Sequence, residues 1–288
     1  MSEITAPPIA GTAVNPNANT VVWTPLEGPL ASMRAGSGPR LVFVHGFTQT
    51  GRSWLPVAES FAADHEVVLV DAPGHGRSSH VRADLRLGAD LIANVGGLAT
   101  YIGYSMGSRF LLHLALAYPH LVRSLAVLGC TGGISNDDER NDRRAADEAL
   151  AEEIEADGVD AFLTKWLAQP MFATLPDYAK GLDDRSQNTA DGLGSSLRLA
   201  GTGSQLPLWS RVRWIQAPTL TMAGELDTKY TALAIQLAAA IGKNAVFQPI
   251  PNAGHAAHLE QPFAVVSVLR EWMTANRQNP RATANARR

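Results

Sequence analysis

Short, continuous apolar runs alternate with amphipathic segments along most of the chain. The runs are of the length expected for strands buried on both faces, and lie at 41–44, 67–71, 99–102, 121–128, 218–224 and 245–250. Helical spacing is found at 54–63, 90–98, 110–117, 231–241 and 262–277, and an edge hairpin is predicted at 21–25 and 30–33. Alternating strands and helices predict an α/β fold with a mostly parallel central sheet and helices on both faces.

This alternation is interrupted in the middle of the chain. Residues 134–213 contain charged helical segments and no convincing strand, which predicts an inserted helical cap. The core would then consist of residues 20–133 and 214–277. We expect residues 1–19 to be a disordered lead-in, because they carry prolines without periodicity, and residues 278–288 to be a flexible basic tail.

Composition and charge narrow the class of protein. Hydrophobic residues make up 45% of the chain and charged residues 18%, as in ordinary globular proteins. The net charge of −3 gives no reason to expect nucleic acid or an anionic membrane as partner. No run approaches the ~18 apolar residues of a membrane span. The N-terminus lacks the pattern of a secretory signal, so we expect a cytoplasmic protein. The oligomeric state is left open.

Sequence motifs for cofactors are also missing. The single cysteine, Cys130, excludes an intramolecular disulfide and most cysteine-based metal sites. The chain has no metal-ligand motif, glycine-rich phosphate loop or dinucleotide fingerprint, so we expect no cofactor.

The most informative motif is Gly103-Tyr104-Ser105-Met106-Gly107, which lies between a predicted strand and a predicted helix. A Gly-x-Ser-x-Gly turn in this context is typical of a nucleophile elbow, which exposes the serine hydroxyl at the sheet edge. Ser105 is therefore the candidate nucleophile.

An activated serine needs a base and an orienting carboxylate. Asp227 and His255 each follow a predicted strand, so both lie at the carboxyl edge of the sheet, where ligands bind in open α/β folds. Glu225 is the alternative acid and His258 the alternative base.

An oxyanion hole needs two backbone donors. We expect them to be the N–H groups of Met106, after the serine, and of Phe47, in the loop after the first buried strand.

Several motifs together resemble the α/β-hydrolase fold superfamily. They are His45-Gly46-Phe47, the run from Asp71 to Ser78, the elbow, Gly224-Glu225-Leu226-Asp227 and Ala253-Gly254-His255. The resemblance implies an α/β-hydrolase fold with a serine–histidine–aspartate triad, but it does not fix the reaction, because one fold hosts many chemistries.

A narrower resemblance concerns the cap. The elbow with Arg109, the arginine-bearing segment 137–144, and the runs 166–173, 185–188, 224–230 and 253–260 are similar to the 2-succinyl-6-hydroxy-2,4-cyclohexadiene-1-carboxylate synthases of menaquinone biosynthesis. This resemblance implies that three arginines hold a carboxylate-rich substrate and that two aromatic residues line the pocket. By motif position these residues are Arg109, Arg143, Arg185, Tyr104 and Trp166.

Charge alone explains the cap arginines differently. Glu139 and Asp147 are each four residues from Arg143, so ion pairs on a solvated helix face are the simpler interpretation. Arg140 and Arg144 also compete with Arg143 for the pocket position.

Three functions remain open from the sequence. The family resemblance implies a lyase that eliminates pyruvate by proton abstraction. The triad equally suits a carboxylesterase or carbon–carbon bond hydrolase, and a triad-bearing binding protein is the third alternative. The triad cannot separate the first two, whereas an anion site on the arginines can.

Overall fold

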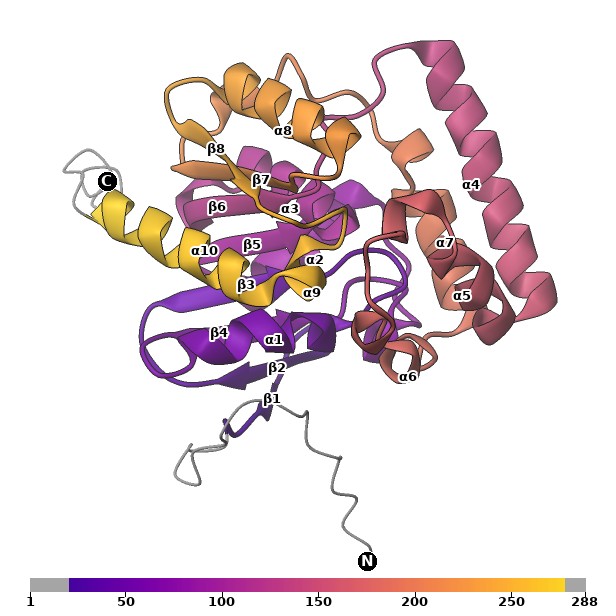
Figure 1. Ribbon diagram of the computed structural model, residues 1–288, viewed down its shortest axis with the longest axis horizontal. Coiled ribbons are helices and arrows are strands. Elements are labelled where there is room, and N and C mark those ends of the chain that lie inside the picture. The colour runs from indigo at the N-terminus through magenta and orange to yellow at the C-terminus, as the bar shows by residue number, and fades with distance from the viewer. Residues whose placement is uncertain (1–20, 278–288) are drawn as a thin grey trace, which may run out of the picture.

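A single eight-stranded sheet organises residues 21–277, the part of the chain that the computed structural model describes (Figure 1). The strands are β1 (Thr24–Leu26), β2 (Ser32–Ala35), β3 (Arg40–Val44), β4 (Glu66–Val70), β5 (Ala99–Tyr104), β6 (Val122–Leu128), β7 (Thr219–Gly224) and β8 (Ala245–Ile250). Their order is β1-β2-β4-β3-β5-β6-β7-β8. The hairpin β1–β2 is antiparallel and joins β4 antiparallel, while the other neighbours are parallel. The predicted α/β fold is confirmed.

Helices cover both faces of this sheet. On one face lie α2 (Leu85–Gly96), α3 (Met106–Ala117) and α8 (Thr228–Ile241), and on the other lie α1 (Leu55–Ala58) and α10 (Pro262–Arg277). Successive residues of a strand point to opposite faces, so Val42 joins one core while Phe43 joins the other. Burial on both faces explains why the strands were visible as unbroken apolar runs.

Four predicted helices have different bounds in the structure, and those expected at 110–117 and 231–241 differ only in beginning three or four residues earlier. The single helix expected at 54–63 is wrong: only Leu55–Ala58 is α-helical, between 3₁₀ turns at Gly51–Trp54 and Glu59–Phe61. Pro56 lies in the first turn of α1, where its missing N–H would have no intrahelical partner, so it is compatible with an α-helix that begins at Leu55 but not with one that begins a turn earlier.

The helix expected at 90–98 begins earlier, at Leu85. The Asp84 side chain caps it by accepting a hydrogen bond of 2.7 Å from the N–H of Leu87. The helix ends at Gly96, and Gly97 follows with φ of 59°.

Segment 134–213 is helical and holds no strand in the structure. It contains α4 (Asp137–Asp157), α5 (Val159–Leu167), α6 (Leu182–Arg185) and α7 (Ala190–Ala200), which lie together beside one end of the sheet (Figure 1). We call residues 134–213 the cap; its division from the core stays a proposal. The expectations for residues 1–19 and 278–288 lie outside the described residues.

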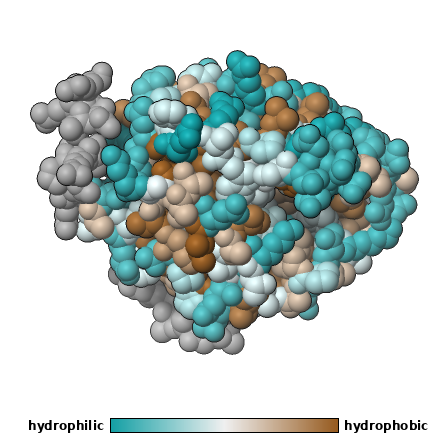
Figure 2. Space-filling view, turned by 90° about the horizontal axis from the view of Figure 1, so that it is seen from above, coloured by the Kyte–Doolittle hydropathy of each residue, from teal (hydrophilic) through white to brown (hydrophobic). Residues whose placement is uncertain are grey.

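Most of the charged side chains of helix α4 lie at the surface. Its only buried residues are Asp147, Ala151 and Ile154. Figure 2 shows the end of the molecule where α4 lies covered largely by hydrophilic residues. The acidic residues of this helix therefore lie mostly outside the interior of the cap.

Candidate active site

Ser105 lies in a strained turn between β5 and α3. Its φ is 50° and its ψ is −110°, a conformation that a non-glycine residue adopts only where its surroundings enforce it. A Cβ on Gly107 would lie 2.3 Å from the carbonyl oxygen of Val44, and one on Gly103 would lie 2.7 Å from the nitrogen of Ser108. The two motif glycines therefore let α3 approach β3 and β5 closely enough to form the elbow.

The structure brings Ser105, His255 and Asp227 together in one chain of hydrogen bonds. The Ser105 hydroxyl donates to His255 Nε2 at 3.3 Å, and His255 Nδ1 donates to Asp227 Oδ2 at 2.7 Å. The His255 side chain is almost fully buried, which restricts its ring to this arrangement. This arrangement has the connectivity that general-base activation of a serine requires.

The two alternative residues lie differently. Glu225 is exposed, and its Oε2 accepts a hydrogen bond of 3.4 Å from the N–H of Asn252. His258 is fully buried, with its ring centroid 4.5 Å from that of Trp54 and 4.3 Å from that of Tyr104. Neither contacts Ser105 through a hydrogen bond in the described chain.

Two backbone N–H groups are available beside Ser105 for an oxyanion. In the loop after β3, the N–H of Gly46 donates to Gln49 Oε1, and the N–H of Thr48 donates to His75 Nε2. Phe47, between them, has no acceptor for its N–H among residues 21–277, and neither has Met106 at the first position of α3. The two N–H groups expected to bind an oxyanion thus donate to no protein atom in the described residues. Their role stays a proposal.

Two neutral histidines hold the loop after β3 in place, which we call the oxyanion loop after the role proposed for Phe47. His45 Nδ1 donates to the carbonyl of Gly46 at 2.8 Å, while its Nε2 accepts from the N–H of Ala72 at 2.9 Å. His75 likewise donates from Nδ1 to Pro73 and accepts at Nε2 from Thr48. Burial lowers the pKa of His45 to about 4 and that of His75 to about 3.

Aromatic rings from core and cap surround the triad. Tyr104 lies 5.3 Å from the His255 ring, measured between centroids, and Phe172 of the cap lies 6.3 Å from it. Trp166 on α5 packs 5.3 Å from Phe47 and 5.9 Å from Phe172. Tyr104 and Trp166 thus belong to this group of aromatic residues, and their role as pocket residues stays a proposal.

Arg109 is a buried cation in the first turn of α3. It is 7% exposed, and its Nη1 donates to the carbonyl of Ala200 at 2.7 Å, at the C-terminal end of α7. Burial lowers its pKa, and the nearby Arg143 guanidinium lowers it further. No carboxylate within residues 21–277 forms an ion pair with Arg109.

Arg143 is paired within its own helix, but with a buried partner. Its Nε forms an ion pair of 2.7 Å with Asp147, four residues later on α4, as the spacing of charges along this helix predicts. Asp147 is buried, however, and its other oxygen accepts from the N–H of Gly203 at 3.0 Å. Arg140 instead pairs with Asp137, and Arg144 donates to the carbonyl of Gly203.

Arg185, the last residue of α6 in the cap, is the second buried cation. It is 2% exposed, its Nε donates to the carbonyl of Lys180 at 2.7 Å, and its Nη1 donates to Thr48 Oγ1. Burial lowers its pKa to about 10. The guanidinium lies near enough to Tyr104 to offset part of the rise that burial causes in the pKa of that phenol.

Tyr230 is a site residue that the sequence reasoning did not single out. It lies in the first turn of α8, and its ring centroid is 4.4 Å from that of His255. Its N–H donates to Asp227 Oδ1 at 3.1 Å. A signal was present, because an aspartate three residues before an N–H is a common helix cap, but it does not show which way the ring points.

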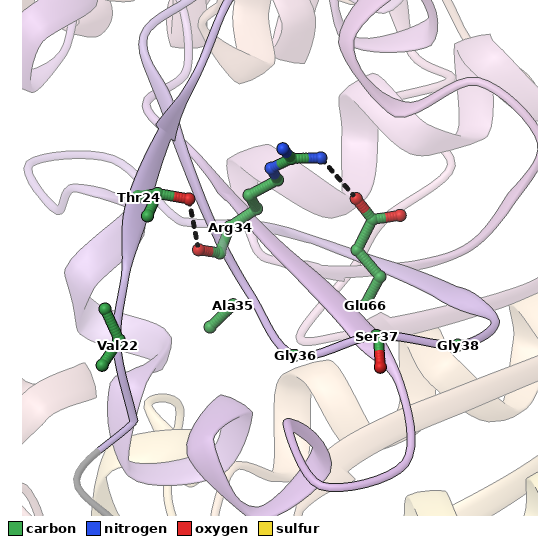
Figure 3. Close-up of a pocket in the computed structure, with 8 residues that line it drawn as sticks. All are labelled: Val22, Thr24, Arg34, Ala35, Gly36, Ser37, Gly38 and Glu66. Carbon is green, nitrogen blue, oxygen red and sulfur yellow. Dashed lines mark hydrogen bonds and ion pairs between the residues drawn. The ribbon is translucent and has the colours of Figure 1, made fainter.

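Other features of the described residues add no further candidate chemistry. Residues 21–277 contain no cluster of histidine, cysteine, aspartate and glutamate that could hold a metal ion. No helix in this range is long and apolar enough to cross a membrane. Figure 3 shows a hollow beside β1 and β2, at the edge of the sheet away from the triad, in which the Arg34 guanidinium is already paired with Glu66 at 3.3 Å.

Comparison with known proteins agrees with this geometry. Residues 41–268 match the model of the alpha/beta hydrolase family. The chain belongs to this family. Within it, a Bacillus subtilis protein named "Putative 2-succinyl-6-hydroxy-2,4-cyclohexadiene-1-carboxylate synthase" is 32% identical over 86% of this chain and 93% of its own length. An Escherichia coli O1:K1 protein named "2-succinyl-6-hydroxy-2,4-cyclohexadiene-1-carboxylate synthase" is 31% identical over 80% of this chain and 92% of its own length.

A solved structure extends the likeness to three dimensions. MenH from S. aureus superposes with a TM-score of 0.77 at 26% identity, covering 88% of this chain and 98% of the other. The alpha/beta hydrolase fold and the narrower resemblance inferred from the motifs are therefore confirmed.

Proposed function

We propose that this protein is a lyase that eliminates pyruvate from 2-succinyl-5-enolpyruvyl-6-hydroxy-3-cyclohexene-1-carboxylate, giving 2-succinyl-6-hydroxy-2,4-cyclohexadiene-1-carboxylate. Ser105, His255 and Asp227 are its catalytic residues, and no cofactor takes part. The names of relatives at 31% and 32% identity support the reaction, which belongs to menaquinone biosynthesis.

The observation that carries the proposal is the pair of buried guanidinium groups beside the triad. Arg109 and Arg185 donate only to backbone carbonyls and one hydroxyl within residues 21–277. A buried charge without a counter-charge is destabilising by several kcal/mol, so each of these cations favours an anion bound next to it. Arginine binds carboxylates in two-pronged geometry, and the proposed substrate carries three of them.

The reaction starts at the ring hydrogen next to the succinyl carbonyl. His255 deprotonates the Ser105 hydroxyl, and the Ser105 oxygen takes this hydrogen from ring carbon 2. The electrons form a double bond between carbons 2 and 3 and shift the existing one to carbons 4 and 5. The bond from carbon 5 to the enolpyruvyl oxygen breaks, and the leaving enolpyruvate gains a proton and becomes pyruvate.

The oxyanion donors stabilise the charge that develops in the reaction, and the arginines bind the substrate. As the proton leaves, negative charge develops on the succinyl carbonyl oxygen, which the N–H groups of Phe47 and Met106 stabilise. Arg109, Arg143 and Arg185 hold the carboxylates, while Tyr104 and Trp166 enclose the ring. The small anionic substrate is the only partner that the proposal requires.

Pyruvate release, coupled to lactate dehydrogenase, tests the proposal. Wild type should release pyruvate well above the uncatalysed rate. Ser105→Ala should lose at least about 10³-fold in kcat, and Arg109→Met at least about 30-fold in kcat/KM, since truncating one member of a buried charge pair costs about 2 kcal/mol or more. Arg198→Met is the matched control, because Arg198 is a cap arginine already paired with Glu148 at 2.8 Å.

A carboxylesterase or carbon–carbon bond hydrolase is the second candidate function. The triad and the two free N–H groups favour it, because a tetrahedral oxyanion fits the same donors as an enolate. Turnover of a neutral p-nitrophenyl ester that persists in Arg109→Met, together with background-level pyruvate release by wild type, would establish this function and overturn the lyase.

A further inference from the structure

Tyr230 is held against both the acid and the base of the candidate triad. Its backbone N–H is bonded to Asp227 Oδ1, and its ring lies 4.4 Å from the His255 ring between centroids. These two contacts come from opposite ends of the residue, so they restrict both its backbone and its ring. The hydroxyl group is then directed by the structure and not by free rotation of an exposed side chain.

Charged groups from several elements act on the Tyr230 hydroxyl. Arg109 from α3 and Arg143 from the cap are near enough to lower the pKa of this phenol, and Asp227 and Cys130 are near enough to raise it. Burial raises the pKa of the Tyr230 phenol, and the two guanidinium groups offset part of the rise. The group is thus a neutral O–H donor at neutral pH.

This donor is not used within the protein. The Tyr230 hydroxyl has no hydrogen-bond partner within residues 21–277, and the residue is partly buried. The nearby guanidinium groups of Arg109 and Arg143 cannot satisfy this donor, since they accept no hydrogen bonds. An anion between the hydroxyl and the two arginines would satisfy all three groups.

We propose that Tyr230 is a substrate-binding residue whose hydroxyl donates a hydrogen bond to the carboxylate held by Arg109 and Arg143. Its ring, packed on His255, places that carboxylate at a fixed position relative to the base. The inference rests on the proposed function in that it takes the ligand to be a carboxylate-rich substrate. It adds a neutral donor, contributed by the first turn of α8, to a site otherwise made of cations.

Tyr230→Phe separates the hydroxyl from the ring. Phenylalanine keeps the packing on His255 and the backbone bond to Asp227, and removes only the donor. A hydrogen bond to a charged group contributes enough for KM toward the enolpyruvyl substrate to rise about tenfold, with kcat within about twofold of wild type. Tyr178→Phe is the matched control, because Tyr178 is 85% exposed on the cap surface.

Succinate binding tests the inference independently of turnover. Measured by titration calorimetry, the Kd of wild type for succinate should rise about tenfold in Tyr230→Phe and stay unchanged in Tyr178→Phe. A wild type that binds succinate but releases no pyruvate would overturn the proposed reaction while leaving this inference to be decided by the Tyr230→Phe affinity. Unchanged succinate affinity in Tyr230→Phe, or no succinate binding to wild type, would overturn the inference.

Discussion

Asp227 uses its two carboxylate oxygens for two purposes. Oδ1 caps α8 by accepting from the N–H of Tyr230 at 3.1 Å, and Oδ2 accepts from His255 at 2.7 Å. The helix cap fixes the carboxylate, and the carboxylate fixes the imidazole. A local rule of helix formation thus orients a candidate catalytic group.

Asp227→Asn separates these two purposes. Asparagine is as good an N-cap as aspartate, so the melting temperature should stay within a few degrees of wild type. Its amide cannot hold His255 in the required tautomer, and kcat should fall by about 10³- to 10⁴-fold. Glu225→Gln is the control and should keep wild-type kcat, because Glu225 is exposed and contacts only the N–H of Asn252.

The sequence identified the triad candidates but not the contacts that support them. Ser105, Asp227 and His255 could be predicted because each follows a strand, and parallel strands end at one edge. Tyr230 could not, because its role depends on where α8 places its ring relative to Arg109 and Arg143. Chain order is a local property, whereas such side-chain neighbours arise only in the folded structure.

Among the elements, the short segment after α6 joins the cap to the core. Asn188 Nδ2 donates to the carbonyls of Thr48 and Arg185, each at 2.8 Å, and its Oδ1 accepts from the N–H of Gly76 at 2.7 Å. One buried side chain therefore connects the cap, the oxyanion loop and the loop after β4. Correct placement of the Phe47 N–H depends on this connection.

Asn188→Ala should weaken both stability and catalysis. It leaves the Gly76 N–H and the Thr48 carbonyl unpaired in a buried position, which destabilises the fold by about 2–4 kcal/mol. Urea unfolding would measure this loss, and kcat should fall more than KM rises, because the oxyanion loop is less well held. The neighbouring Gln187→Ala, exposed at the surface, should change neither; equal behaviour of the two variants would contradict the argument.

At the element scale, prediction succeeded where the pattern was determined by burial alone. Strands β3, β4 and β7 were located to within one or two residues, because their runs are apolar on both faces. The helix expected at 54–63 was wrong, because the apolar spacing did not distinguish the single α-helical turn at Leu55–Ala58 from the 3₁₀ turns on either side of it. Periodicity reports which side chains are buried, but not which backbone groups bond.

In the molecule as a whole, several buried histidines are kept neutral. His45 and His75 each use one ring nitrogen as a donor and the other as an acceptor, so protonation would break a hydrogen bond in either. His258 has no partner for either nitrogen within residues 21–277, and burial lowers its pKa well below the usual value. All three groups bind a proton far more readily in the unfolded chain.

Stability should therefore fall as the pH is lowered through the unfolded-state pKa near 6.5. The folded-state pKa values of His45 and His75, about 4 and about 3, lie below it, so between these limits the unfolded state holds more protons. From pH 7 to pH 5, each such histidine should remove about 2 kcal/mol of unfolding free energy. Urea unfolding at pH 7, 6 and 5 would measure the slope.

His258→Phe tests the contribution of one of these histidines to the slope. Phenylalanine retains the packing between Trp54 and Tyr104 and removes two unpartnered nitrogens, so stability at pH 7 should be unchanged or higher. The loss between pH 7 and 5 should shrink by about 2 kcal/mol, because one fewer proton is taken up on unfolding. His80→Gln, an exposed position, should leave the slope as in wild type. A slope that His258→Phe leaves unaltered would show that His258 does not contribute to the acid sensitivity.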